Sequence, residues 1–580
     1  MVAKLTRGGE ALKEKLIDEG ASALVQMDED ELVTDDHLIE LPPQEPPCHA
    51  GTMKDHPVRK RTLDDIRRAI IDDQLEIAGT LLNKLLARPT VEAEAYMLAG
   101  RLAFAQRDSA RELQMMQAAV DQEPSNGEYI ALLGRCHARA QDIDAALACV
   151  DAALACSPLN DLAYDALASI LVQLGRHGDA AMLLRRATKA GSRNPAIFFN
   201  LGNNLKFTGD FEGARAAFEQ ALVVAPRYHK AHAALTSLGG ITADSNNLPR
   251  LLAMIRQTED PRAAIHLRHA AAKESEALGR YDEAWQHLTV GKSALRTVLP
   301  NDPQGAVEAM DDLAEIVRHG DQEGAGGPPA DSPILIVGMP RSGTTVLDRV
   351  ISNHSEVTSI GESLYFAQLL KAKCGSTSRG LLDAQTLDAL SSETDLLETG
   401  ARYVAHSNQM SRGAPRFVDK FHLNFMLTGH LLRALPSARI LCVIRDPLDT
   451  IVSNFRQLFE FESALYAYSL DIAATTEFYI RFRRLAALWE ALAPDRFRTV
   501  RYEKLVTDPE GETASLLSFC GLPWQDGCSA IEHNNASVAT ASAVQVRSKI
   551  HTGSIGNWRR YEGHLVGAMR RLAEEGLLSA

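Results

Sequence analysis

The chain has 580 residues, of which 45% are hydrophobic and 23% are charged, and its formal net charge is −14. This length exceeds one hydrophobic core and predicts about two to four structural units. The acidic balance argues against a general nucleic-acid binder, for which a basic surface is expected. The eight cysteines form no CxxC pair that would indicate zinc, so we expect reduced, mostly buried thiols.

Residues 1–60 predict a flexible N-terminal segment, because a short polar start passes into an acidic, proline-rich stretch. The first residues, MVAKLTRGGEALKEKL, lack the apolar core of a signal peptide. No run of about 18 apolar residues occurs in the sequence. We therefore expect no membrane span and a cytoplasmic protein.

Residues 61–318 predict a helical domain with a unit that recurs every 34 residues. Pro124, Pro158 and Pro226 mark this period, since they are 34 and 68 residues apart and each follows an apolar helix. Small residues inside the units allow two helices to cross closely, and the prolines end the second helix. The pattern resembles the tetratricopeptide repeat, which implies an α solenoid with a concave surface for a peptide or protein partner.

Residues 319–332, HGDQEGAGGPPADS, predict a linker into a second domain over 333–580. In that domain, helical stretches alternate with strand-like apolar runs at 334–337, 416–420, 438–446 and 497–505. The alternation predicts a P-loop-like α/β domain with a mostly parallel sheet and helices on both faces. Ligands of such sheets bind at the carboxyl ends of the strands.

The first of these runs leads directly into a glycine-rich turn, GMPRSGTT at 338–345, and then into a helical pattern. Backbone N–H groups and the helix dipole converge at such a turn and form an anion site. Thr344 stands where the triphosphate loop GxxxxGK[ST] has its lysine, so the clamp for β/γ-phosphates and its magnesium arrangement are missing, and we expect no metal.

The turn resembles the 5′-phosphosulfate loop of sulfotransferases that use 3′-phosphoadenosine 5′-phosphosulfate, and residues 333–575 resemble the tyrosylprotein sulfotransferases and their bacterial relatives. The resemblance implies this nucleotide as co-substrate. Its 5′-phosphosulfate would lie against Arg341, Ser342, Gly343, Thr344 and Thr345.

A second motif, CVIRDPLDTIVSNF, supplies Arg445 from a buried strand and Ser453 from a helix. An arginine fork and a hydroxyl can together bind a terminal phosphate, and the resemblance assigns these two residues to the 3′-phosphate. Arg445 could instead form a structural ion pair at the strand end. The resemblance further implies nucleotide contacts from Tyr502, Ser542, Gln545 and Trp558, although Asn557 stands where the tyrosylprotein enzymes have a lysine before the tryptophan.

Sulfuryl transfer needs a base for the acceptor hydroxyl and a cation for the leaving phosphate. Glu362 occupies the position of the base in the tyrosylprotein enzymes, and Lys420 matches the lysine that contacts the transferring group. His422 competes with Glu362, because the cytosolic sulfotransferases of phenols and steroids use a K-x-H arrangement with histidine as base. We favour Glu362, since its distance from the loop fits a base.

The sequence thus predicts a sulfotransferase that acts on a hydroxyl or phenol, with a peptide or protein tyrosine among the candidate acceptors and the repeats recruiting the acceptor or a protein partner. One alternative is a P-loop kinase. Another is an interaction module whose C-terminal domain is inactive. The repeats could also be a structural scaffold that binds nothing outside its own chain, or only a second copy in a homodimer.

Overall fold

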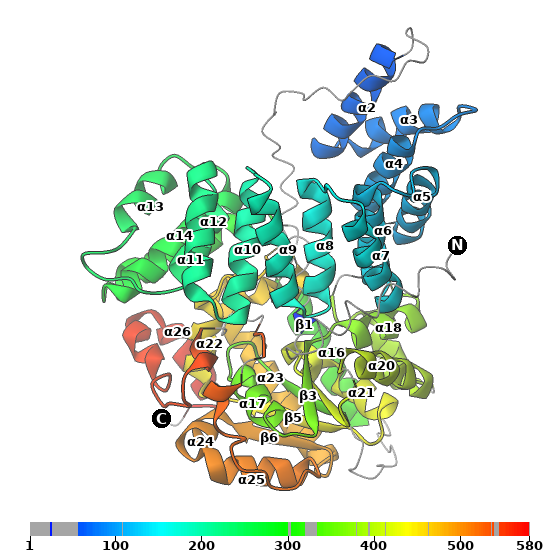
Figure 1. Cartoon of the computed structure of the whole chain (residues 1–580). Coiled ribbons are helices and arrows are strands. Elements are labelled where there is room, and N and C mark those ends of the chain that lie inside the picture. Colours follow the sequence, from blue (N-terminus) through cyan, green and yellow to red (C-terminus); the bar gives the residue numbers. More distant parts are fainter. Residues whose placement is uncertain are drawn as a thin grey trace. The chain divides into compact units, whose positions relative to one another are not determined.

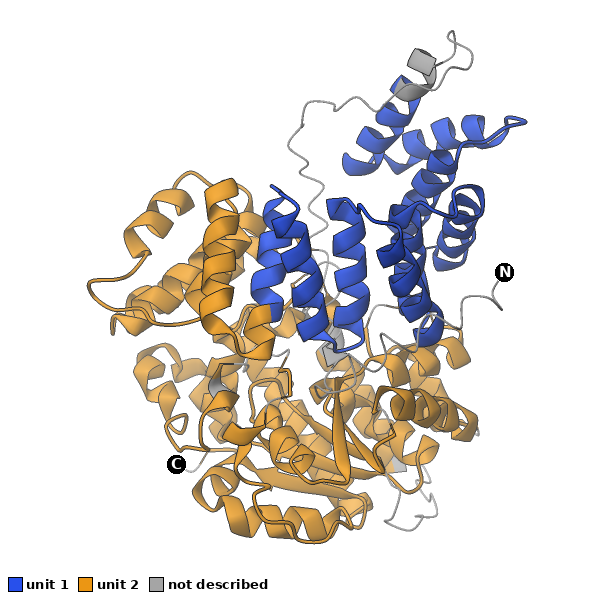
Figure 2. Ribbon diagram, viewed as in Figure 1, with its two compact units in different colours: residues 1–19, 29–204 blue, residues 20–28, 205–580 orange. Residues whose placement is uncertain are grey.

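The computed structural model describes residues 24–25, 56–106, 108–299, 303–319, 333–376, 378, 380–392, 395–411, 413–461, 463–534, 536–538 and 544–578 (Figure 1). The predicted segment 1–60 and linker 319–332 fall outside these ranges, except for 24–25, 56–60 and His319. The chain divides into two compact units, residues 1–19 with 29–204 and residues 20–28 with 205–580 (Figure 2). The division falls inside a helix of the predicted repeat region.

The first unit is a series of helix pairs: α2 (His56–Ile71), α3 (Leu75–Leu86), α4 (Ala93–Ala105), α5 (Ser109–Gln122), α6 (Gly127–Arg139), α7 (Ile143–Ala155), α8 (Asp161–Gln173), α9 (His177–Lys189) and the start of α10 (Pro195–Thr208). Gly134 on α6 shows why the repeats need small residues. A Cβ there would lie 2.7 Å from Cβ of Cys149 on α7 and 2.9 Å from Cδ1 of Ile170 on α8. The predicted α solenoid is confirmed.

In the second unit, further helices precede the sheet: α11 (Phe211–Val224), α12 (His229–Ser237), α13 (Leu248–Ile255), α14 (Pro261–Ala277), α15 (Tyr281–Arg296) and α16 (Pro303–His319). Trp285 on α15 packs against Phe455 and Tyr561 of the C-terminal region, with ring centroids 4.8 and 5.3 Å apart. The buried Nζ of Lys292 donates hydrogen bonds to the carbonyl oxygens of Gln457 and Ser469, at 3.0 and 2.7 Å. These contacts explain why α15 groups with the sheet.

The sheet has the order β1-β3-β4-β2-β5-β6 and every pairing is parallel, as the sequence predicted. Its strands are β1 (Leu24–Val25), β2 (Ile334–Gly338), β3 (Val357–Glu362), β4 (Arg416–Asp419), β5 (Arg439–Ile444) and β6 (Phe497–Arg501). All five residues of β2 are buried. Leu335 and Val337 belong to one hydrophobic core, and Ile334 and Ile336 to another on the opposite face, so helices cover both faces.

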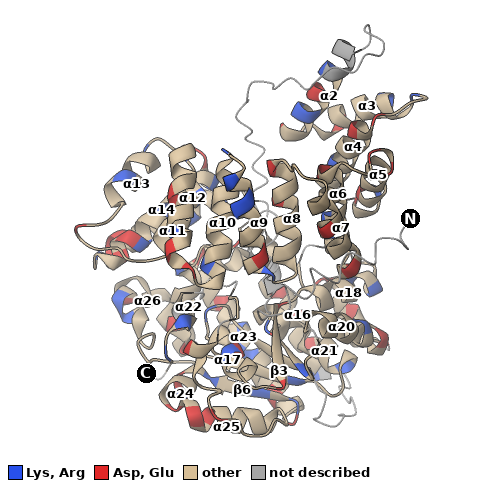
Figure 3. Cartoon of the chain, viewed as in Figure 1, with Lys and Arg blue, Asp and Glu red and all other residues tan. Residues whose placement is uncertain are grey.

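The remaining elements of the second unit are α17 (Thr344–Ser352), α18 (Tyr365–Cys374), α19 (Ala384–Ser391), α20 (Leu397–Met410), η2 (His422–Leu427), α21 (Thr428–Ala434), α22 (Pro447–Arg456), η3 (Ala464–Leu470), α23 (Ile472–Leu492), α24 (Tyr502–Thr507), α25 (Pro509–Phe519), η4 (Ile531–His533), η5 (Gln545–Arg547), η6 (Asn557–His564) and α26 (Val566–Glu574). Basic and acidic residues are interspersed along the helices of both units (Figure 3). Within the described ranges, no helix is long and apolar enough to cross a membrane.

Candidate functional site

The glycine-rich turn connects β2 to α17, where the sequence predicted an anion site. Gly338 has φ 147°, and a Cβ there would lie 2.6 Å from the carbonyl oxygen of Val443 on β5. Gly343 has φ 110° and caps α17, and a Cβ there would lie 2.3 Å from the Tyr502 ring. Both positions therefore need glycine. The first N–H groups of α17 have no acceptor within the helix and can bind an anion.

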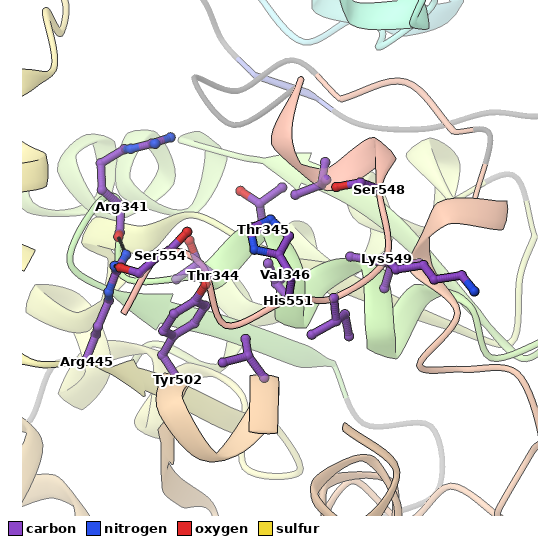
Figure 4. Close-up of a pocket in the computed structure, with 15 residues that line it drawn as sticks. Arg341, Thr344, Thr345, Val346, Arg445, Tyr502, Ser548, Lys549, His551 and Ser554 are labelled. Atoms are coloured by element: carbon purple, nitrogen blue, oxygen red, sulfur yellow. Dashed lines mark hydrogen bonds between the residues drawn. The ribbon is translucent and has the colours of Figure 1, made fainter. Parts of the chain in front are cut away.

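A pocket with an empty volume of about 630 Å³ opens beside this turn (Figure 4). Six of the predicted nucleotide-binding residues line it, namely Arg341, Gly343, Thr344, Thr345, Arg445 and Tyr502. Ser342 does not line the pocket. Its side chain is fully buried, and its Oγ has no hydrogen-bond partner among the described residues.

Arg445 joins the two predicted nucleotide motifs. Its Nη1 donates a 3.2 Å hydrogen bond to the carbonyl oxygen of Arg341, and its guanidinium lies 4.7 Å from the centre of the Tyr502 ring. Asp449, one turn along α22, lies 3.6 Å from Nη2. Burial and the nearby Arg456 and Arg445 lower the pKa of Arg341 to about 10. Arg341 therefore carries positive charge at neutral pH, and it lies at the same end of the pocket as Arg445 (Figure 4).

The stretch 544–558 supplies lining residues that the sequence reasoning missed: Ser548, Lys549, His551 and Ser554. Their signal was a run of basic and hydroxyl residues, SKIHTGS, inside a stretch already singled out by resemblance. Asp449 holds this stretch, because its carboxylate accepts hydrogen bonds from the N–H groups of Gly556 and Trp558 at 2.7 and 3.0 Å.

Four other predicted contacts are not among the lining residues of the pocket. Trp558 is half-buried against the main core, with Arg559 over its ring, and is not a lining residue. Ser453 is partly buried on α22 and is not a lining residue either. Ser542 and the side chain of Gln545 lie outside the described residues.

The predicted catalytic residues Glu362, Lys420 and His422 form one cluster at the ends of β3 and β4. Parallel pairing places Gly361 opposite Asp419 and so brings the following residues together. Nζ of Lys420 forms an ion pair with Oε1 of Glu362, and Nδ1 of His422 lies 3.5 Å from the same oxygen. The three side chains are only 15%, 2% and 8% exposed, in the order first named.

The cluster fixes the charge of Glu362. Burial raises the pKa of this carboxyl, but Lys420 and His422 outweigh burial and hold the pKa at about 2. Glu362 is thus ionised at neutral pH and is a weak base. The two residues that the sequence presented as competing bases lie in contact, where one can orient the other.

Asp419 links the ends of β3 and β4 next to this cluster through hydrogen bonds. Its Oδ1 accepts a 3.3 Å hydrogen bond from the N–H of Ser363, and its Oδ2 accepts from the hydroxyl of Tyr403. Burial raises the pKa of Asp419 to about 7. These hydrogen bonds join the residue after Glu362 to the residue before Lys420, and so fix how these two side chains meet.

Together, the structure brings a cationic pocket beside a helix N-terminus and a lysine–carboxylate–histidine cluster to the carboxyl edge of one parallel sheet. Such an arrangement can bind an anionic nucleotide and move a proton during group transfer.

Sequence comparisons identify both parts of the chain. Residues 333–526 match the Sulfotransferase family, and residues 97–161, 131–195 and 195–228 match the Tetratricopeptide repeat. The chain therefore joins tetratricopeptide repeats to a sulfotransferase-family domain, and both resemblances drawn from the sequence are confirmed.

The chain is similar to several known proteins. An uncharacterized protein of Aquifex aeolicus (strain VF5) is 26% identical over 425 residues, which are 71% of this chain and 54% of that protein. Protein-tyrosine sulfotransferase 1 of Danio rerio is 23% identical over 224 residues, 37% of this chain and 60% of that protein. Nodulation protein H of Rhizobium meliloti (strain 1021) is 28% identical over 209 residues, 33% of this chain and 78% of that protein. The chain thus matches little more than half the length of the first two.

Proposed function

We propose that the C-terminal domain transfers a sulfuryl group from 3′-phosphoadenosine 5′-phosphosulfate to a hydroxyl or phenol acceptor. The observation that carries this proposal is the position of the Lys420–Glu362–His422 cluster and the 338–345 turn at the carboxyl ends of neighbouring strands, β2, β3 and β4. The match to the sulfotransferase family supports it.

The donor fits the pocket, because arginines, hydroxyl groups and a helix N-terminus line it. Arg341, the turn from Ser342 to Thr345 and the first N–H groups of α17 bind the 5′-phosphosulfate. Arg445 binds the 3′-phosphate, and Tyr502 borders the nucleotide. From the resemblance, Ser542, Gln545 and Trp558 are further candidate contacts of the nucleotide. No metal is required, since the turn has no lysine–magnesium arrangement.

In the transfer step, His422 accepts the proton of the acceptor hydroxyl. Glu362 orients the imidazole through Nδ1, so that Nε2 is the basic nitrogen. Lys420 stabilises the negative charge that develops on the bridging oxygen of the leaving phosphate. This assignment reverses the preference for Glu362 from the sequence, because its ion pair with Lys420 makes Glu362 a weak base.

The repeats recruit the acceptor or a protein partner in this proposal, and a homodimer is a further arrangement they would support. A peptide or protein tyrosine is the acceptor suggested by the zebrafish relative. The seven cysteines that the structure describes are all free thiols. Free thiols are typical of a reducing compartment, and the proposal places the protein in the cytoplasm.

Binding calorimetry tests the donor assignment against the two rivals. We expect 3′,5′-diphosphoadenosine to bind without magnesium and ATP·Mg to bind weakly. Tight binding of ATP·Mg alone would favour a P-loop kinase. Absence of nucleotide binding by a protein whose repeats capture a partner would favour an interaction module with an inactive domain.

A further inference from the structure

The hydroxyl of Tyr466 lies within hydrogen-bond reach of the proposed base. It lies 3.1 Å from Nε2 of His422, the nitrogen that faces away from Glu362. A base that removes a proton must lie within hydrogen-bond reach of that proton. Tyr466 therefore meets, in the folded chain, the geometric requirement that the proposed mechanism places on a phenolic substrate.

A neighbouring aromatic ring also fixes the orientation of the Tyr466 ring, as a bound phenolic acceptor would require. Phe459 stacks on it with ring centroids 4.8 Å apart and an interplanar angle of 13°. The Tyr466 residue remains partly exposed to solvent. Stacking fixes the direction of the phenol while leaving its hydroxyl at the histidine.

The segment that carries Phe459 and Tyr466 is anchored at both ends by α15. Nζ of Lys292 donates to the carbonyl oxygens of Gln457 and Ser469, which flank the two aromatic residues. Arg296 forms a 2.8 Å ion pair with Asp471 just beyond them. These anchors hold the phenol at the base without a separate binding step, which raises its effective concentration there.

We propose that Tyr466 is a modification site and that the enzyme sulfates this tyrosine of its own chain. The inference rests on the proposed sulfotransferase function. In the reaction, a bond forms between Oη of Tyr466 and sulfur, while the bond between sulfur and the bridging phosphate oxygen breaks. The phenolic proton passes to Nε2 of His422 and then to solvent. The products are the tyrosine sulfate ester and 3′,5′-diphosphoadenosine, so no further reactant is needed.

The test uses full-length protein made in a host that cannot synthesise the donor. Donor labelled with ³⁵S is added without any acceptor, and the labelled peptide is identified after proteolysis. We expect at most one label per chain, on the peptide with Tyr466. The rate constant should not change with protein concentration, because the reaction occurs within one chain.

Tyr466→Phe keeps the stacked ring and removes the hydroxyl, so labelling should fall at least about tenfold. Tyr281→Phe is the matched control, because Tyr281 is also partly exposed and packs on Tyr561 away from the base, and it should label like the wild type. Without donor, Tyr466→Phe should shift the ¹⁵N resonance of His422 Nε2, whereas Tyr281→Phe should not.

Three outcomes separate this inference from the proposed function. Binding of 3′,5′-diphosphoadenosine and sulfation of an added phenol, with no label on Tyr466, would overturn self-sulfation and leave the function intact. Equal labelling of the Tyr466→Phe protein would also overturn it. Loss of both nucleotide binding and phenol sulfation would reject the function itself.

Discussion

Lys420 pairs with Glu362 across the ends of β4 and β3, with the lysine side chain 2% exposed and the glutamate 15% exposed. Because both groups are largely removed from water, removing one partner would leave the other as an uncompensated buried charge. The pair also links Lys420, the proposed cation for the leaving group, to Glu362, which is proposed to orient His422. Loss of either partner should therefore affect both stability and transfer.

Glu362→Gln leaves the Lys420 ammonium without its counter-charge, so we expect a loss of about 3 kcal/mol in unfolding free energy at pH 7. The folded pKa of about 2 is depressed below the unfolded value. The stabilisation is thus present above the unfolded pKa of about 4.3 and is lost as the pH falls toward 2. Denaturant unfolding at pH 7 and pH 3 checks this: the wild type should lose more stability on acidification than the variant. An equal loss would mean that the pair does not stabilise the fold.

His422→Asn should lower kcat by roughly a hundred- to ten-thousandfold while the affinity for 3′,5′-diphosphoadenosine stays near the wild-type value. The wild-type rate should also fall in acid, since a protonated imidazole cannot accept a proton. A pH–rate profile measured with a phenol acceptor shows this directly. A rate that is flat down to pH 4, together with a mild His422→Asn variant, would return the role of base to Glu362.

Arg445→Ala should weaken binding of 3′,5′-diphosphoadenosine about 10- to 100-fold, because a charge-assisted contact with phosphate is lost. Arg501→Ala is the control, since Arg501 is an exposed arginine at the end of the neighbouring strand β6. Calorimetry of the two variants compares them under the same conditions. Similar weakening in both would indicate general electrostatics rather than a defined phosphate contact.

Gly343→Ala should destabilise the domain by about 1–3 kcal/mol and abolish nucleotide binding, because it combines a strained φ of 110° with a clash against Tyr502. Gly527→Ala separates the two effects. Gly527 also has a positive φ, 84°, but a Cβ there meets nothing within 4 Å. Thermal unfolding with and without 3′,5′-diphosphoadenosine should show a ligand-induced rise in Tm for Gly527→Ala only. A rise of normal size in Gly343→Ala would show that the turn does not contact the nucleotide.

Local patterns in the sequence were sufficient for much of this fold. The 34-residue period predicted the repeats, and the apolar run before GMPRSGTT predicted β2 and its anion-binding turn. β3 was missed as a strand, because VTSIGE has only two apolar side chains and one of its residues is glycine. The division of the compact units inside α10 was also not predictable, since the repeat spacing continues through that helix without a break.

The sequence named individual candidate residues but did not show which of them come together. Glu362 and His422 are 60 residues apart in sequence, and only the parallel pairing of β3 with β4 brings them into contact. In the sequence alone, the two residues were therefore alternative candidates for the base. Lys549 and His551 lie in an irregular stretch whose path depends on tertiary contacts such as those of Asp449, so no periodicity pointed to them.

Transfer of ³⁵S from labelled 3′-phosphoadenosine 5′-phosphosulfate to an added phenol is the most direct test of the proposed activity. The wild type should form the labelled sulfate ester together with 3′,5′-diphosphoadenosine, without magnesium. Lys420→Ala should bind the nucleotide but transfer at least about a hundredfold more slowly, since the leaving phosphate loses its cation. Transfer at an unchanged rate by Lys420→Ala, or hydrolysis of ATP in place of sulfuryl transfer by the wild type, would contradict the account.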